Sequence, residues 1–148
     1  MPLTGRYEPS ARGWVRQQAE TFEASGGARA ADLNGRPIVV LTSIGARTGL
    51  LRKTPLMRIE HQGEYAVLAS DGGSATPPNW YYNVKMHPRV DLQDGAAKKQ
   101  YLAREAEGAE RAIWWERAVA TWPDFDRYTV GLDRIIPVFV LRPIVVPQ

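Results

Sequence analysis

Residues 38–56 read Ile-Val-Val-Leu-Thr-Ser-Ile-Gly-Ala-Arg-Thr-Gly-Leu-Leu-Arg-Lys-Thr-Pro-Leu, and this stretch decides the fold. It begins with an apolar run typical of a strand and passes through a glycine turn into a second extended run. Gly45 and Gly49 let the backbone turn sharply and present N–H groups, while Arg47 and Arg52 add positive charge. The stretch predicts either an anion-binding turn or a basic hairpin loop in solvent. It matches neither a Walker A loop nor a dinucleotide-binding fingerprint.

Further extended runs surround this hairpin. After the first run, 37–43, apolar and polar residues alternate over 52–60 and 64–70 with a glycine turn between them. Two more runs, about 90–94 and 98–105, flank an Asp-Gly hairpin signal, and a last apolar run covers 136–141. Because short turns join most neighbours, about six strands predict an antiparallel α+β barrel and exclude a doubly wound parallel sheet.

An N-terminal helix is expected before the strands. Ser10 is its predicted N-cap, and Trp14 and Phe22 recur at helical spacing up to about residue 24. Two glycines end the helix, and small polar residues follow. We therefore expect a single domain in which residues 1–36 form a helix and linker and residues 37–148 form the barrel.

Two more helices are expected within the barrel segment. A short middle helix covers 79–85 and closes before Pro88, and a longer one covers about 109–122 and stops at Pro123, before the last strand. The predicted apolar face of the longer helix consists of Ala112, Trp115, Val119 and Trp122.

The composition excludes several classes of function. The 148 residues carry a net charge of +3, which leans modestly toward an anionic ligand. With no cysteine, disulfides, thiolate catalysis and Cys-ligated metals are excluded. His61 and His87 lie in an expected turn and at a helix end, so no metal site is expected. No apolar run reaches the roughly 20 residues of a membrane span and no signal pattern opens the chain, which predicts a soluble cytoplasmic protein.

Four blocks of sequence, in order, resemble the deazaflavin-dependent nitroreductase family of actinobacteria, which belongs to the split β-barrel flavin and deazaflavin oxidoreductases. The resemblance covers about residues 38–143. It implies a split antiparallel β-barrel that binds coenzyme F420, a deazaflavin with a phosphate and oligoglutamate tail, and that reduces quinones, nitroaromatics or similar acceptors. The blocks are Val40-Leu41-Thr42 with Gly45-Ala46-Arg47-Thr48-Gly49 and Arg52-Lys53-Thr54-Pro55-Leu56, then Ala69-Ser70-Asp71-Gly72-Gly73, then Asn79-Trp80-Tyr81-Tyr82-Asn83, then Asp133-Arg134 with Ile136-Pro137-Val138.

The resemblance also implies where the coenzyme is held. The glycine turn and the strand after it would bind the phosphate and anionic tail, the third extended run and the turn after it would border the deazaflavin ring, and the middle helix would close over the coenzyme. The implied cofactor-binding residues are Ala46, Arg47, Thr48, Arg52, Lys53, Thr54, Pro55, Leu68, Ala69, Ser70, Asp71, Asn79, Trp80, Tyr81, Tyr82, Asn83 and Phe125.

Three positions depart from the better-studied members of that family. Asp71 and Ala46 stand where basic residues are common, which implies a weaker hold on the anionic tail. Phe125 stands where a tyrosine of the nitroreductases lies over the substrate site, and a phenyl ring cannot donate a proton. We therefore expect nitroimidazole reduction to suffer more than quinone reduction. Tyr128 is the retained tyrosine that could reach the same pocket.

The expected reaction is direct hydride transfer from the reduced coenzyme to an electron-poor acceptor. Few protein groups are needed because the coenzyme carries the chemistry. Ser70 and Tyr128 are the catalytic candidates, since a hydroxyl could stabilise the negative charge that develops on the acceptor oxygen. This agrees with the lack of any nucleophile with a plausible histidine partner in the sequence.

Three alternatives stay open from the sequence. The same anion-binding turn could hold the phosphate of FMN in a flavin reductase of the same fold. The barrel could also carry the deazaflavin without turnover. A nucleic-acid-binding barrel ranks last, because the aromatic residues cluster beside helices and do not alternate with Lys and Arg along a strand.

The Trp14 helix raises the question of partners. Arg12 and Arg16 flank Trp14, which would suit an anionic membrane surface, but Glu20 and Glu23 give the helix a mixed charge. Packing on the barrel or on a partner subunit, as in a homodimer, is the favoured interpretation, and peripheral membrane contact is the weaker one. Liposome co-sedimentation that is unchanged after removal of residues 1–30 would argue against membrane contact.

Overall fold

The apolar run of the 38–56 stretch forms a strand that is paired on both edges in the computed structural model, which describes residues 3–145. This strand, β2 (Arg36–Ile44), has six consecutive buried residues, because both of its faces are covered. It pairs in antiparallel fashion with β3 (Leu51–Met57), with β6 (Arg89–Asp94) and with the two-residue strand β1 (Asp32–Leu33). The predicted hairpin is thus confirmed, with Ile44 opposite Leu51 at its tip.

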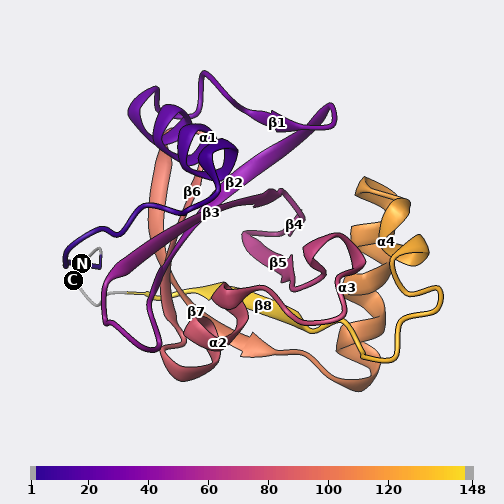
Figure 1. Ribbon diagram of the computed structural model, residues 1–148. Helices are drawn as coiled ribbons and strands as arrows, with labels where there is room; N and C mark the ends of the chain where they lie inside the picture. The colour runs from indigo at the N-terminus through magenta and orange to yellow at the C-terminus, as the bar shows by residue number, and fades with distance from the viewer. Residues whose placement is uncertain (1–2, 146–148) are drawn as a thin grey trace.

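The remaining strands complete one curled antiparallel sheet, which forms a half-barrel (Figure 1). Within the described residues the sheet has eight strands in the order β1-β2-β6-β7-β8-β5-β4, with β3 on β2. Six of them are the longer strands expected from the sequence, so the α+β split-barrel prediction is confirmed. The other bounds are β4 (Glu60–His61), β5 (Glu64–Leu68), β7 (Ala97–Glu105) and β8 (Val138–Pro143).

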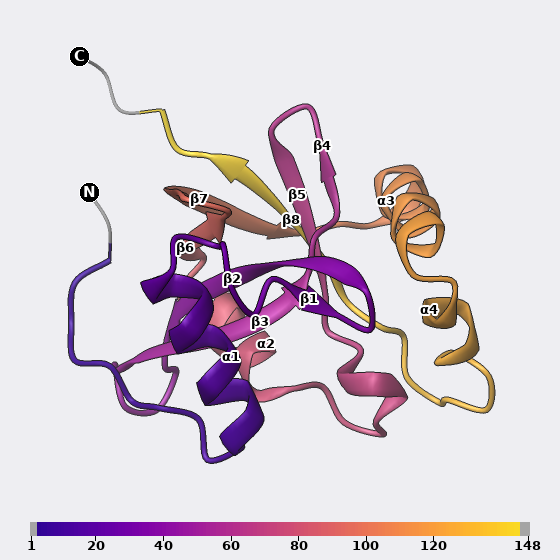
Figure 2. The same ribbon diagram turned by 90° about the horizontal axis from the view of Figure 1, so that it is seen from above.

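The helices cover the ends of the half-barrel. Figures 1 and 2 show α1 on one side of the sheet and α3 with α4 on the other, while α2 lies below β7 and β8 in the view of Figure 1. Residues 146–148 of the expected barrel domain lie outside the described residues. The helices are α1 (Gly13–Ala24), α2 (Asn79–Met86), α3 (Gly108–Thr121) and α4 (Asp124–Arg127), with a 3₁₀ turn η1 (Asp71–Gly73).

Burial of apolar side chains explains how α1 docks. Val15, Ala19 and Phe22 are buried on one face of the helix, and Ala19 and Phe22 pack against Ile38 and Val40 of β2. Fully burying a side chain such as phenylalanine is worth about 1.5–3 kcal/mol. The apolar face of the helix is therefore buried, whereas Trp14 lies off this face and is 54% exposed.

Several local predictions are wrong in detail. Ser10 does not cap α1, because the helix begins at Gly13; the Ser10 hydroxyl instead accepts a hydrogen bond from the N–H of Arg12 at 3.1 Å. The run 52–60 is two strands, since β3 ends at Met57 and β4 begins at Glu60. The expected linker contains β1.

The long helix and the last strand also differ from the prediction. α3 buries Trp114 and Ala118, while Ala112 of the predicted face is exposed. The last strand begins at Val138, because Pro137 has no N–H to donate to the ladder. α4 is a further helix, outside the three expected from the sequence, and it forms directly after Pro123.

Within residues 3–145, no helix is both long enough and apolar enough to cross a bilayer. In the same part of the chain, no group of three or more His, Asp or Glu side chains is arranged to hold a metal ion.

Candidate functional site

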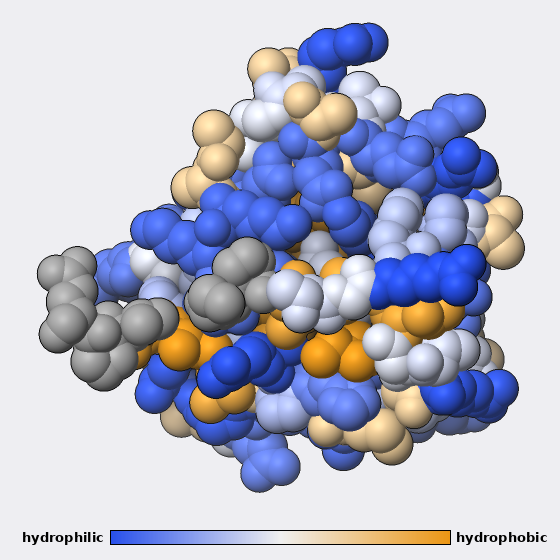
Figure 3. Space-filling view, turned by 90° about the vertical axis from the view of Figure 1, so that its left-hand side faces the viewer, coloured by the Kyte–Doolittle hydropathy of each residue, from blue (hydrophilic) through white to orange (hydrophobic). Residues whose placement is uncertain are grey.

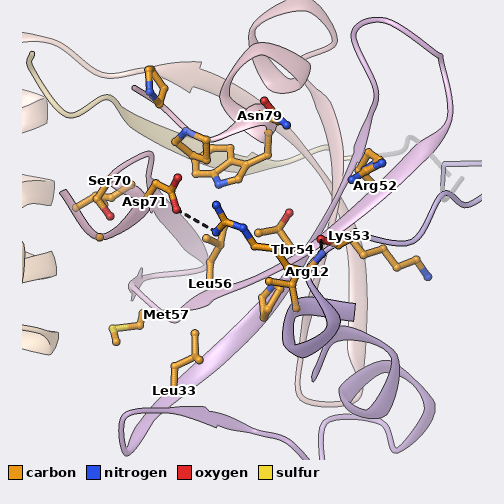
Figure 4. A pocket seen from close by; sticks show the side chains of 18 of the residues that line it. Arg12, Leu33, Arg52, Lys53, Thr54, Leu56, Met57, Ser70, Asp71 and Asn79 are labelled. Carbon is orange, nitrogen blue, oxygen red and sulfur yellow. Dashed lines mark hydrogen bonds and ion pairs between the residues drawn. The ribbon is translucent and has the colours of Figure 1, made fainter. Parts of the chain in front are cut away.

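A cavity of about 630 Å³ opens between α1, β3, the segment after β5, and α4 (Figure 4). Its size is that of a small-molecule or cofactor pocket. The start of α1 and the β1 turn contribute one wall, β3 contributes the floor, residues 68–83 contribute a second wall, and residues 122–128 contribute a third. Four segments that lie far apart in the sequence therefore meet at this one site.

The cations of β3 reach the cavity already paired with acids. The guanidinium of Arg52 donates a hydrogen bond to the Glu8 carboxylate at 2.5 Å. Lys53 forms an ion pair with Glu23 and lies over the ring of Tyr7, 5.0 Å from its centre. Each cation is thus held in a fixed position, and an anionic ligand would share it with a carboxylate.

Two groups that contact Lys53, Glu23 and Tyr7, have shifted pKa values. Burial raises the pKa of Glu23, but hydrogen bonds and charge attraction from Lys53 and Lys98 outweigh it, so the net shift is downward. Burial, together with a hydrogen bond to Glu20, raises the pKa of Tyr7 to about 12. Glu23 therefore stays ionised and Tyr7 stays neutral at physiological pH.

An ion pair connects two walls of the cavity. Arg12, next to the start of α1, lies 3.4 Å from the carboxylate of Asp71 on η1, as the dashed line in Figure 4 shows. The Arg12 side chain is 63% exposed, so the pair is screened and contributes little to stability. It lies where a ligand entering from this side would meet it.

The second wall contains an unusual backbone turn. Ser70 has right-handed dihedral angles, and Asp71 and Gly72 follow with φ of 46° and 65°. Such a right-handed to left-handed succession brings neighbouring N–H groups together into a concave donor site. Within the described residues no hydrogen bond uses the N–H of Ser70 or Asp71, so both are available to a ligand.

The start of α2 and the hairpin loop are joined beside this turn. Asn79 and the buried Trp80 line the cavity at the N-terminus of α2, where helix N–H groups favour negative charge. Asn83, one turn further on, accepts a hydrogen bond from the N–H of Ala46 at 2.9 Å. The glycine turn of the hairpin is thereby tied to the helix that closes the cavity.

The third wall presents a hydroxyl between aromatic rings. The indole N–H of Trp122 donates to the hydroxyl oxygen of Tyr128 at 3.0 Å. Phe125 is buried and meets the Tyr128 ring edge-on at 6.0 Å between ring centres. Because the indole uses a lone pair of the oxygen, the hydroxyl hydrogen of Tyr128 remains for a ligand.

The structure brings most of the implied site residues together. The lining includes twelve of them, both catalytic candidates among them: Arg52, Lys53, Thr54, Pro55, Leu68, Ser70, Asp71, Asn79, Trp80, Asn83, Phe125 and Tyr128. The residues outside the lining are Ala46, Arg47, Thr48, Ala69, Tyr81 and Tyr82. Arg47 is exposed at the hairpin tip, and Tyr82 is 51% exposed.

Sequence reasoning assigned no site role to several residues of the cavity. Trp14 and Leu33 line it from segments interpreted as a helix stripe and a linker, and Met57 and Trp122 were assigned only to a strand and a helix face. Arg134 lies outside the lining but bonds to the turn that does line it. Its place in the last block of the resemblance was the only signal in the sequence.

These residues fit a flat ligand with a polar edge and an anionic end. Leu56, Leu68 and Trp80 offer apolar surface, the N–H groups of Ser70 and Asp71 offer donors, and the cations of β3 offer positive charge. A deazaflavin with a phosphate-containing tail has this chemistry.

Comparison with known proteins identifies the family. A family model described as F420H(2)-dependent quinone reductase matches residues 14–143. The chain belongs to this family. The resemblance seen in the sequence is thus confirmed, and members of the F420H2-dependent quinone reductase family are oxidoreductases.

Individual relatives agree with this assignment. A protein of Mycobacterium tuberculosis H37Rv that is provisionally named as such a reductase is 34% identical over 107 residues, which are 72% of this chain and 90% of that protein. An F420H(2)-dependent quinone reductase of the same organism is 30% identical over 110 residues, 71% of this chain and 72% of that protein.

Solved structures give the same result. An F420-H2 dependent reductase, FDR-A, superposes with a TM-score of 0.69 and 47% identity, covering 72% of this chain and 95% of that one. A protein described as a domain-swapped dimer superposes with a TM-score of 0.71 and 43% identity, covering 90% of this chain and 100% of that one.

Proposed function

We propose that this protein transfers a hydride from reduced coenzyme F420 to a quinone bound in the cavity between α1, β3 and α4. The observation that carries the proposal is the cavity itself, in which apolar surface, a backbone donor turn and paired cations converge in a chain of the F420H2-dependent quinone reductase family. When bound, the reduced deazaflavin supplies the hydride.

The residues of the cavity bind and orient the two reactants. Leu56, Leu68 and Trp80 exclude water from the apolar part of the cavity, and the N–H groups of Ser70 and Asp71 would hold the polar edge of the deazaflavin. Arg12, Arg52 and Lys53 would face its anionic tail. Because hydride transfer depends on the approach of two flat molecules, this orientation is the main contribution of the protein.

Tyr128 and Ser70 are the proposed groups at the acceptor oxygen. The Tyr128 hydroxyl is oriented by Trp122 and can donate its hydrogen to an oxygen that becomes negative. Phe125 shares this wall but has no proton to give. We therefore propose a quinone as the preferred acceptor and nitroaromatics as poorer ones, since water can protonate a hydroquinone anion.

The proposal is tested by titrating the purified protein with coenzyme F420 and measuring the fluorescence of the coenzyme. We expect saturable binding, and mixing with the reduced coenzyme and menadione should restore the deazaflavin absorbance. A yellow protein that carries a flavin spectrum would favour the FMN reductase instead. Binding of F420 without acceptor-dependent oxidation would favour a carrier.

Replacement of Tyr128 by phenylalanine is expected to lower kcat with menadione roughly 10-fold, the value of one lost hydrogen bond in the transition state. The affinity for coenzyme F420 should stay unchanged, because the ring still packs on Phe125. The matched control is Tyr101→Phe, in the barrel core and outside the cavity, which should leave kcat unchanged. An unaltered kcat in Tyr128→Phe would remove Tyr128 from the mechanism.

Homodimer formation and peripheral membrane contact stay predictions. Figure 3 shows a band of apolar residues between hydrophilic ones on the face that lies at the left of Figure 1, and such a band suits contact with a second copy. The 43% identical relative described as a domain-swapped dimer supports the first expectation. Membrane contact has less support. Because α1 packs its apolar face on β2, Trp14 is the one large apolar side chain that the described helix α1 leaves exposed for a membrane surface.

A further inference from the structure

Arg134 makes three hydrogen bonds to the main chain of the turn that lines the cavity. It lies between α4 and β8 and is half-buried. Its Nη1 donates to the carbonyl of Ala69 at 3.1 Å, its Nη2 to the carbonyl of Ser70 at 2.9 Å, and its Nε to the carbonyl of Ser74 at 2.9 Å. One side chain thus holds both ends of residues 69–74.

Apart from Arg134, the turn is held by the N–H of Ala69, which donates to the carbonyl of Pro137 at 2.9 Å, and by the exposed ion pair of Asp71 with Arg12. Its own backbone provides two hydrogen bonds, from Gly73 to Ser70 and from Ser74 to Asp71. Asp71 has a φ of 46°, which is unfavourable for a residue with a side chain. A turn of this kind keeps its conformation only if its surroundings impose it.

The peptide geometry determines where the free donors point. No peptide bond in the described chain is cis, so the carbonyl of each residue points opposite to the N–H of the next one. Since the carbonyls of Ala69 and Ser70 point to Arg134, the N–H groups of Ser70 and Asp71 point away from it. Both residues line the cavity and Arg134 does not.

We propose that Arg134 is a positioning residue that fixes these two N–H groups as donors for the polar edge of the coenzyme. The inference rests on the proposed function, because it names how that site is held in shape. A planar guanidinium with five N–H donors can reach three carbonyls at once, whereas a lysine ammonium cannot match this fork. Arg134 therefore acts through the backbone and needs no contact with the ligand.

The test compares Arg134 with Arg111, a second arginine whose side chain donates to a backbone carbonyl. Arg111 donates to the carbonyl of Ile136 at 2.7 Å and is also half-buried, but it does not bond to residues 69–74. We expect Arg134→Ala and Arg111→Ala both to lower the unfolding midpoint. Only Arg134→Ala should weaken coenzyme F420 binding, raising Kd roughly 10- to 100-fold because the donors are no longer held in place.

Two further measurements separate positioning from general stability. Guanidinium ion added below denaturing concentration should restore part of the F420 affinity of Arg134→Ala and none of the affinity lost in Arg134→Lys. If Arg134→Ala does not fold, F420 binding by Arg134→Lys tests the inference instead. This variant keeps the positive charge but loses the planar set of N–H donors. An Arg134→Lys protein that binds F420 as tightly as the unaltered protein would overturn the inference, as would equal losses in the Arg111 and Arg134 variants. Failure of the unaltered protein to bind F420 would instead overturn the proposed function, and the inference with it.

Discussion

Replacement of Gly27 by alanine is expected to destabilise the protein by about 3–5 kcal/mol, because the new methyl group would overlap backbone atoms. Gly27 follows α1, has a φ of +79°, and faces the turn between β6 and β7. A Cβ at this position would lie 2.5 Å from the Cα of Gly95 and 2.7 Å from its carbonyl carbon and oxygen. Neither backbone can move without separating α1 from the β6–β7 hairpin.

Thermal or urea unfolding monitored by circular dichroism measures this effect. For a chain of this size the loss corresponds to a drop of about 10 °C in Tm. The matched control is Gly63→Ala, since Gly63 has a φ of +82° but no atom within 4 Å of the new Cβ. This control should lose only the roughly 1 kcal/mol of left-handed strain. Equal losses in the two variants would show that close contact with Gly95 is unimportant.

Replacement of Gly73 by valine is expected to reduce kcat/KM with menadione roughly 100-fold, since small misplacements of binding groups cost this much. Gly73 has a φ of +85°, and a Cβ there would lie 3.2 Å from both the Cβ and the carbonyl oxygen of Tyr128. The branched side chain would push η1 and α4 apart. The change would displace the N–H donors of residues 70–71 and the Tyr128 hydroxyl together.

The control for this prediction is Gly131→Val, in the loop that follows α4. Gly131 has a φ of +73° and would bring its new Cβ near no other atom. Both variants carry the same backbone strain, so only Gly73→Val should lose most of its activity. Steady-state kinetics with reduced F420 and menadione provide the comparison, and similar kcat/KM values in the two variants would contradict the proposed geometry.

Much of the fold followed from short-range patterns in the sequence. The apolar run 38–42, the glycine turn and the Asp94-Gly95 signal all gave the correct strands and hairpins, because alternation and turn residues act over a few neighbours. The prediction failed where local rules compete. Ser10 was predicted to cap α1, yet the helix begins three residues later, because the burial of Ala19 and Phe22 against β2 places it.

The candidate site, too, was predicted from the sequence only in part. The motifs selected twelve residues of the cavity lining, but they could not show that Arg52 and Lys53 are paired with Glu8 and Glu23, which lie 44 and 30 positions away. Nor could they join Arg134 to residues 69–74.

The sequence by itself thus determined the kind of protein: a cysteine-free α+β barrel of a deazaflavin-dependent family, with its longer strands, its hairpins and twelve of its lining residues. Only the tertiary structure decided which cations are already paired, which donors are available and which arginine holds them. The physical reason is that strand and turn preferences are local, whereas ion pairs and carbonyl contacts depend on where the folded chain brings distant residues together.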